Sequence, residues 1–208
     1  MTAACIRPYT SIVPTLTPEA VTAAGVALVA ERGVGALGVR PVAARLGVTP
    51  MALYRHAASG EALTSAVIER IVAELPVPGA DADWQGAFRR WAHDARAVLA
   101  RYPGLAAHLL TSWFRSPAML AVIEGLLAVA GERPGDRFER VASSNAVLMY
   151  VLMRAQAEQA VRQAGVVHRE LADRDRPLLR AHREEYTTAK LDEHFAYGLD
   201  ALLAGLAR

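Results

Sequence analysis

Prolines and glycines divide this chain at short intervals, and the segments between them repeat apolar residues at helical spacing. Residues three and four apart share one face of a helix, whereas a half-buried strand needs apolar residues at every second position. No convincing run of β-branched residues follows that second pattern. Because proline and glycine end helices, the chain is predicted to be all-α, with helices bounded by these breaks.

Composition places the chain among ordinary globular proteins and limits its partners. Of 208 residues, 53% are hydrophobic and 21% charged, so the chain can bury a sizeable core. Its single cysteine, Cys5, allows no intrachain disulfide, which fits the reducing cytoplasm. Uncharged stretches such as 141–153 are shorter than the roughly 20 residues that span a bilayer. The net charge is only +2, so any contact with nucleic acid has to be local.

The first 75 residues predict a tail of residues 1–16 and a four-helix domain of residues 17–75. Thr17 is expected to cap the first helix, and Pro18 suits its first position. The predicted helices run from Thr17 to Gly33, from Arg40 to Leu46, from Pro50 to about His56 with Thr49 as cap, and from Ser59 onward as a long fourth helix. Pro76–Asp81 cannot continue a helix and marks the domain boundary.

Residues 83–208 predict a second helical domain. An aromatic seam runs along one helix from Trp84 to Tyr102, and Pro103-Gly104 ends it. Further helices are expected over 118–131, 136–163 and 183–207, with a charged connection at 173–177 before the last.

Two short helices joined by Gly47-Val48-Thr49 have the proportions of a helix-turn-helix, whose second helix enters the major groove of DNA. If Leu53 points inward, then Pro50, Met51, Tyr54 and Arg55 share the outer side of the second short helix. Arg40 and Arg45 on the preceding helix could then reach phosphates. The alternative is that these arginines are an ordinary solvated face.

The segment from Val42 to His56 resembles the N-terminal signature of tetracycline-repressor (TetR) family regulators, and Gly33 and Leu63 lie where that pattern expects them. The resemblance implies that Arg40, Pro50, Met51 and Arg55 face base edges, while Tyr54 and His56 contact phosphates or brace the helix. Tyr54 could instead pack beneath that helix. The candidate DNA-binding residues are Arg40, Arg45, Thr49, Pro50, Met51, Tyr54, Arg55 and His56.

Two positions depart from the family pattern. Gly60 stands where the family usually has a lysine that contacts phosphate, and Val39 stands where a threonine or serine often caps the second helix. Residues 1–75 carry six arginines and five glutamates, a net charge of +1. DNA binding is therefore expected to be weaker and less resistant to salt than is usual for the family.

The chemistry of an enzyme is not visible in this sequence. The six histidines are scattered, no glycine-rich loop follows a strand, and the only thiol lies in the tail. We therefore expect neither catalysis nor a cofactor or metal.

A ligand pocket is predicted in the second domain. Asn145, Met149 and Gln156 fall on one stripe of the long helix, and buried amides require partners. They either bond to other core groups or orient a ligand, and the aromatic and methionine residues nearby are either pocket walls or plain core. The TetR resemblance implies an effector pocket in this domain. The candidates are Trp91, His108, Trp113, Phe114, Met119, Asn145, Met149, Met153 and Gln156.

The final helix is the predicted dimer interface. Its apolar stripe consists of Phe195, Leu199, Leu202 and Leu206, and the long helix that begins near Asp136 could pack beside it. Two such helices from each subunit would form a four-helix seam. The alternative is that this stripe only closes the core of its own chain.

Together these features predict a homodimeric repressor that binds a palindromic double-stranded DNA operator and is released by a small, largely apolar effector. The alternative is a helical small-molecule-binding protein or enzyme whose DNA-binding domain is vestigial.

Overall fold

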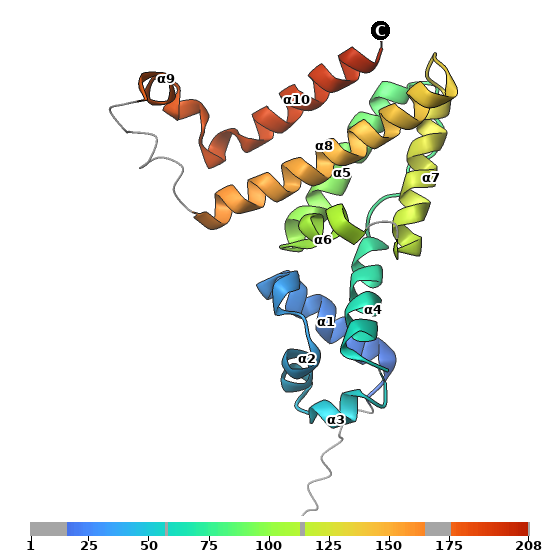
Figure 1. Ribbon diagram of the computed structural model, residues 1–208, viewed down its shortest axis with the longest axis vertical. Helices are drawn as coiled ribbons and strands as arrows, with labels where there is room; N and C mark the ends of the chain where they lie inside the picture. The colour runs from blue at the N-terminus through green and yellow to red at the C-terminus, as the bar shows by residue number, and fades with distance from the viewer. Residues whose placement is uncertain (1–15, 57, 113–114, 165–175, 208) are drawn as a thin grey trace, which may run out of the picture.

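The computed structural model describes residues 16–56, 58–112, 115–164 and 176–207, and every regular element within these ranges is a helix (Figure 1). The all-α prediction is therefore confirmed. No single described helix is both long and apolar enough to span a membrane. The elements are α1 (Pro18–Arg32), η1 (Val34–Ala36), α2 (Val39–Leu46), α3 (Pro50–Leu53), α4 (Gly60–Val72), α5 (Trp84–Arg101), α6 (Leu105–Ser112), α7 (Pro117–Gly131), α8 (Arg137–Ala164), α9 (Pro177–Ala181), η4 (Arg183–Glu185), η5 (Thr188–Lys190) and α10 (Leu191–Leu206).

Side-chain caps set where most of the N-terminal helices begin. Thr17, Thr49 and Ser59 each accept a hydrogen bond from the backbone N–H three residues later, at 3.0–3.3 Å. Such a bond satisfies one of the N–H groups that a helix leaves free at its first turn. The three predicted caps are thus confirmed, and Asp83 and Ser116 cap α5 and α7 in the same way.

Three predicted helix boundaries were wrong. The third helix ends at Leu53, because the N–H groups of Arg55 and His56 bond to carbonyls three residues back and tighten the chain into a turn. Helix α6 was missed: α5 ends at Arg101, and Gly104, at a φ of 83°, turns the chain so that a new helix begins at Leu105. The last helix begins at Leu191, because Thr187 adopts an extended conformation that interrupts the predicted helix.

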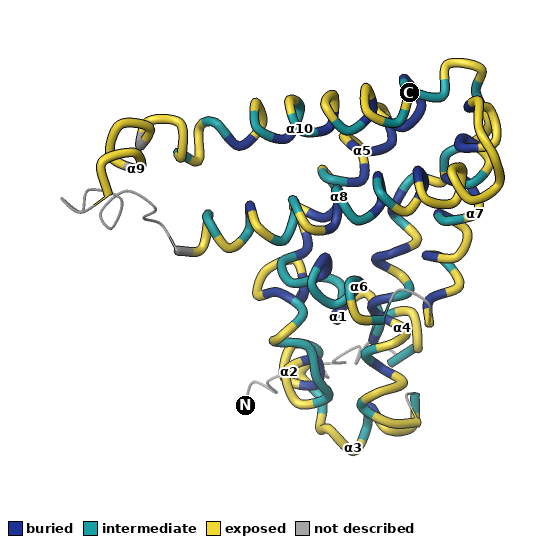
Figure 2. Tube along the Cα trace, turned by 45° about the horizontal axis from the view of Figure 1, so that its top comes forward, coloured by how far each residue is buried: buried dark blue, intermediate teal, exposed yellow. Residues whose placement is uncertain are grey.

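The molecule is elongated, with α1 to α4 in its lower part and α5, α8 and α10 stacked across its upper part (Figure 1). Pro76–Asp81 forms no regular helix between α4 and α5, as predicted. One cluster of buried side chains nevertheless runs from α1 through α4 into α5, α7, α8 and α10 (Figure 2). The division into domains 17–75 and 83–208 therefore stays a prediction, and the tail with Cys5 lies outside the described residues.

The crossing of α1 over α4 depends on a glycine. Gly25 is buried in the middle of α1, and a Cβ atom placed on it would overlap with Cγ2 of Val67 on α4. Val67 is itself fully buried, as are its neighbours Ile71 and Val72. The two helices can approach this closely only because residue 25 has no side chain.

We predict that Gly25→Ala lowers the free energy of unfolding by about 1–3 kcal/mol, the usual cost of overpacking a core. The direction is informative, because alanine normally stabilises the interior of a helix relative to glycine by about 1 kcal/mol. The control is Gly131→Ala at the end of α7, where a Cβ would meet nothing within 4 Å. Urea unfolding should show this control within about 0.5 kcal/mol of wild type. If Gly25→Ala is as stable as the control, the close crossing is not a constraint.

Candidate DNA-binding surface and ligand clefts

The turn between α2 and α3 depends on one glycine and on three buried side chains. Gly47 ends α2 at a φ of 68°, the left-handed region that favours glycine. Val42 and Ala43 of α2 and Leu53 of α3 are buried against the helices behind them. Leu53 points inward as predicted, so the opposite side of α3 has to face solvent at the tip of the molecule (Figure 1).

The outer side of α3 and the turn after it carries the residues predicted to face DNA. Met51 is 72% exposed and Tyr54 is 50% exposed, so Tyr54 does not lie beneath the helix. Thr49, Pro50 and Arg55 are also exposed, and His56 is half-buried. The hydroxyl oxygen of Thr49 accepts from the N–H of Ala52 at 3.3 Å, which leaves its proton free to donate outward.

The three arginines of this region differ in their surroundings. Both guanidinium NH2 groups of Arg45 donate to the two carboxylate oxygens of Glu31 on α1, each at 2.7 Å. The hydrogen bonding from Arg45 is the main cause that lowers the pKa of Glu31. No carboxylate in the described ranges pairs with Arg40 or Arg55. Arg45 therefore ties α2 to α1, while Arg40 and Arg55 keep their charge available to an anionic partner.

The two positions that depart from the family pattern lie against each other. A Cβ on Gly60, the first residue of α4, would stand 3.4 Å from Cγ2 of Val39, the first residue of α2. Glycine has no Cβ, so this distance shows only that the starts of the two helices lie close together. Neither residue carries a side chain that could donate a hydrogen bond to a phosphate.

The predicted ligand-binding residues that the structure describes lie in different surroundings. Trp91 is buried, and its indole N–H donates to the carbonyl of Pro76 at 3.0 Å, which makes it a strut between α5 and the preceding segment. Met119 is fully buried in the core. Trp113 and Phe114 lie outside the described residues.

The amide stripe of α8 lies partly at the surface of the chain's own fold, so its role in a pocket stays a prediction. Asn145 is exposed, Met153 is 57% exposed, and Met149 and Gln156 are half-buried. Asn145 borders a groove of about 160 Å³ between α7 and α8. The chain's own helices cover this face of α8 only in part, since Oε1 of Gln156 is buried while Asn145 and Met153 are exposed.

His108 borders a larger cleft, of about 410 Å³, between α4, α6 and the start of α7. Burial of the imidazole lowers the pKa of His108, so the ring is neutral near neutral pH and offers one donor and one acceptor. The lining is mixed rather than largely apolar. It consists of Glu61, Thr64, Ser65, Ala66, Ile68, Glu69, His108, Leu109, Ser112, Arg115, Ser116 and Pro117.

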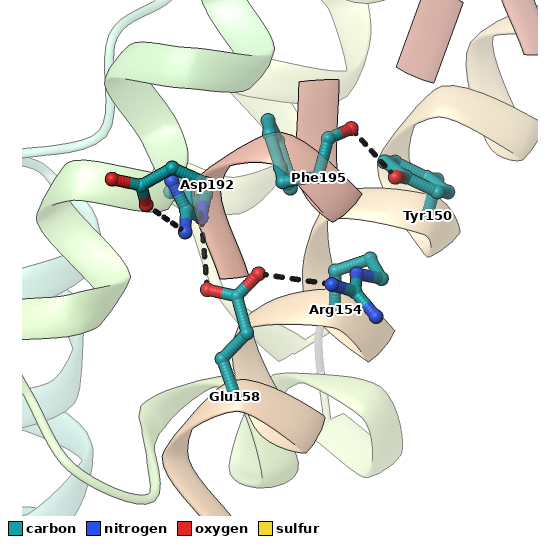
Figure 3. A network of polar contacts seen from close by, with 6 residues as sticks. Tyr150, Arg154, Glu158, Asp192 and Phe195 are labelled. Carbon is teal, nitrogen blue, oxygen red and sulfur yellow. Dashed lines mark hydrogen bonds and ion pairs between the residues drawn. The ribbon is translucent and has the colours of Figure 1, made fainter. Parts of the chain in front are cut away.

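The predicted dimer stripe of α10 is wrong for two of its four residues. Phe195 and Leu199 are fully buried within their own chain, while Leu202 and Leu206 are half-buried. The phenol of Tyr150 on α8 donates to the carbonyl of Phe195 at 2.8 Å (Figure 3). This face of α10 therefore closes the core of the monomer, the alternative that the sequence left open. On another face of the helix, Tyr197 is 80% exposed.

A buried ionic network, which sequence reasoning missed, joins α5, α8 and α10 (Figure 3). Glu158 is only 5% exposed; it accepts from Nε of Arg96 at 2.9 Å and lies 3.5 Å from Arg154. Arg96 also reaches Asp192 on α10 at 2.7 Å. One signal was available in the sequence, because Glu158 is seven residues after the buried Val151 and so shares its face of α8.

Both parts of the chain match known families. Residues 21–67 match the family described as bacterial regulatory proteins, tetR family, and residues 75–208 match the tetracyclin repressor-like C-terminal domain. The class A tetracycline repressor of Escherichia coli, from transposon 1721, is 32% identical. That similarity covers 93% of this chain and 91% of the repressor.

Two solved structures share the fold. BioQ in complex with its double-stranded DNA operator is 25% identical, has a TM-score of 0.67, and matches over 92% of this chain and 98% of BioQ. A TetR variant from Acinetobacter baumannii in complex with minocycline is also 25% identical with a TM-score of 0.67. It matches over 91% of this chain and 96% of that chain.

We predict that Glu158→Gln lowers the free energy of unfolding by about 3–5 kcal/mol, because it removes the buried carboxylate that pairs with Arg96 and leaves only the exposed carboxylate of Asp192 on that arginine. The control is Asp192→Asn, which removes the exposed carboxylate on the same arginine and should cost less than about 1 kcal/mol. Chemical unfolding measures both variants. Equal losses would show that the buried pair has no special weight.

The difference in stability between the wild type and the control Asp192→Asn is expected to depend on pH. The hydrogen bond from Arg96 holds the pKa of Asp192 below its ordinary range. The stabilisation by Asp192 is therefore present above the ordinary aspartate pKa of about 3.9 and is lost as the pH falls through the lower folded-state value. The difference between wild type and Asp192→Asn should shrink over that acidic window.

Proposed function

This chain belongs to the TetR family of bacterial regulatory proteins, and we propose that it is a homodimeric repressor that binds a palindromic DNA operator and releases it when a small molecule occupies the α4–α6–α7 cleft. The observation that carries this proposal is the outward side of α3, where Met51, Tyr54 and Arg55 are exposed around a rigid glycine turn. The operator complex of the relative BioQ supports the same partner.

We propose that Arg55 is the main residue that reads bases and that Arg40 is a second one. Arginine binds a guanine edge through two hydrogen bonds, which discriminates bases by about 1–3 kcal/mol. Helix α3 has only four residues, so one copy reads few bases. Selective binding then requires two copies in successive major grooves, about 34–36 Å apart.

The dimer interface is proposed on the faces of α8 and α10 that the chain's own helices leave uncovered. Met153 and half-buried Met149 provide apolar area on α8, and Tyr197 with the small residue Ala201 provides it on α10. Helix α8 has 28 residues and is about 42 Å long, enough for several turns of antiparallel packing. We therefore still propose a four-helix dimer interface of α8 and α10 from each subunit, but with Tyr197 and Ala201 of α10 in place of Phe195 and Leu199.

The effector is proposed to bind beside α4, the helix that leads from the cleft toward α2 and α3. A ligand that binds one placement of α4 better than another shifts the equilibrium by that difference in affinity. The relative bound to minocycline supports a small-molecule effector of drug size. The mixed lining, with His108 and two glutamates, favours a polar or amphipathic molecule over the largely apolar one that we expected.

A second candidate function is a small-molecule-binding protein that no longer binds DNA. The lack of a hydrogen-bond donor or a cation in the side chains of Val39 and Gly60, and the pairing of Arg45 with Glu31, favour it. A gel shift against the DNA upstream of the protein's own gene separates the two candidates. Mass spectrometry of ligands that copurify with the protein tests the cleft.

We predict that Arg55→Ala weakens operator binding by about 1–3 kcal/mol while binding to random DNA falls much less. The control is Arg70→Ala on α4, an exposed arginine that borders a groove between α1 and α4. This control removes the same charge from the same region and should leave the operator preference unchanged. Equal losses on operator and random DNA by Arg55→Ala would remove that residue from base reading.

We predict that Met153→Glu converts the dimer to a monomer, because a carboxylate would be buried in the apolar seam without a partner. Sedimentation should show half the wild-type mass, and operator binding should be lost. The control is Val77→Glu, a 60% exposed residue in the segment between α4 and α5, which should remain dimeric. A dimeric Met153→Glu protein would place the interface elsewhere.

A further inference from the structure

One carboxylate joins helix α4 to the start of α7. Oε1 of Glu69 accepts from the backbone N–H of Ala118, and Oε2 accepts from the hydroxyl of Ser116, both at 2.6 Å. Ser116 is buried and at the same time caps α7 by accepting from the N–H of Met119 at 3.1 Å. Glu69 is therefore a second cap of α7, supplied by another helix, and its negative charge suits the positive end of the helix dipole.

Two other polar attachments join the same parts of the molecule. Glu74 near the end of α4 accepts from the phenol of Tyr102 at 2.9 and 3.0 Å. The N–H of Val34 donates to the carbonyl of Pro103 at 2.7 Å. Both of these attachments end at the turn between α5 and α6. Of the three, only the Glu69 attachment borders the α4–α6–α7 cleft, together with Ser116.

We infer that Glu69 is the residue through which the cleft controls the placement of the helix-turn-helix, and that the ligand acts by donating hydrogen bonds to this carboxylate. An ionised carboxylate only accepts hydrogen bonds. A group that replaces Ser116 or Ala118 at Glu69 has to be a donor, such as an amine or a hydroxyl. Anionic ligands are disfavoured, because Glu61 and Glu69 both border the cleft and Arg115 is its one arginine among the described lining residues.

The direction of control follows from the proposed function, on which this step rests. In this proposal the closed attachment, with Glu69 bonded to Ser116 and Ala118, belongs to the state that binds DNA. Charge-assisted hydrogen bonds at 2.6 Å are stronger than neutral ones and hold α4 in one orientation relative to α7. A ligand that opens the attachment releases α4 and changes the spacing of the two α3 helices.

The first experiment measures the attachment without operator or effector. Spin labels at Ala44→Cys on α2 and Ala128→Cys on α7, both exposed positions, report one distance within each chain in a Cys5→Ser background diluted with unlabelled protein. The wild type should give a narrow distance distribution, and Glu69→Gln a broader one. The matched control is Glu124→Gln, an exposed glutamate of α7 that does not border the cleft. Equal widths for Glu69→Gln and wild type overturn the inference.

The second experiment measures operator affinity. Glu69→Gln should lower it by roughly 5- to 150-fold, the usual range of coupling between sites, and Glu124→Gln should not. Ser116→Ala should lower it too, and the double variant should lose less than the two single losses combined, because both act on one attachment. A lower melting temperature with unchanged distance and affinity means that Glu69 is only a cap, and overturns the inference. If the wild type binds no DNA, the proposed function fails while the distance measurement still decides the attachment.

The ligand class is tested with three ring compounds that differ in one group: benzylamine, benzyl alcohol and benzoate. The two donors should broaden the distance distribution of the wild type and leave that of Glu69→Gln unchanged. Benzoate, which only accepts, should have no effect. A response to benzoate alone, or none to either donor, overturns the assignment of ligand class.

Discussion

The burial of α4 between α1 and α7 is the interaction on which the rest of this molecule depends. Val67, Ile71 and Val72 are fully buried, and they belong to one apolar cluster that continues into the upper helices. Because α2 and α3 are too short to fold alone, their position is set by the helices behind them. Any movement of α4 is therefore carried to the surface that faces DNA. The same helix borders the cleft, so one element connects both proposed binding sites.

Helical spacing predicted which residues share a face, but not what covers that face. The N-terminal helices were predicted well because their signals are local. Thr17, Thr49 and Ser59 cap backbone groups three residues away, and Gly47 adopts the left-handed conformation that ends α2. The stripe containing Phe195 and the stripe containing Asn145 are both real helix faces. Whether each one meets its own chain or a partner depends on contacts between residues far apart in sequence, which periodicity does not contain.

The polar contacts between helices could not be predicted for the same reason. Arg96 and Glu158 are 62 positions apart, and Glu69 and Ser116 are 47 positions apart. A charged residue on a surface helix normally faces water. These residues become partners only when the packing of α5 on α8 and of α4 on α7 removes them from solvent. Trp91 shows the opposite case, in which a residue predicted to line a pocket is part of the core. Its N–H donates to the backbone carbonyl of Pro76.

In the proposed function, the distribution of charge makes DNA binding sensitive to the distance between the two α3 helices of the dimer. Electrostatic affinity for DNA rises with the number of phosphates that a protein neutralises. In this chain Arg45 is paired with Glu31, and the side chains of Val39 and Gly60 offer neither a cation nor a hydrogen-bond donor. Little non-specific attraction then remains to hold a misplaced dimer on DNA. Binding has to come from base contacts made by two α3 helices at once, and those contacts require the right separation. In the proposed function, a small change in the placement of α4 therefore releases the operator.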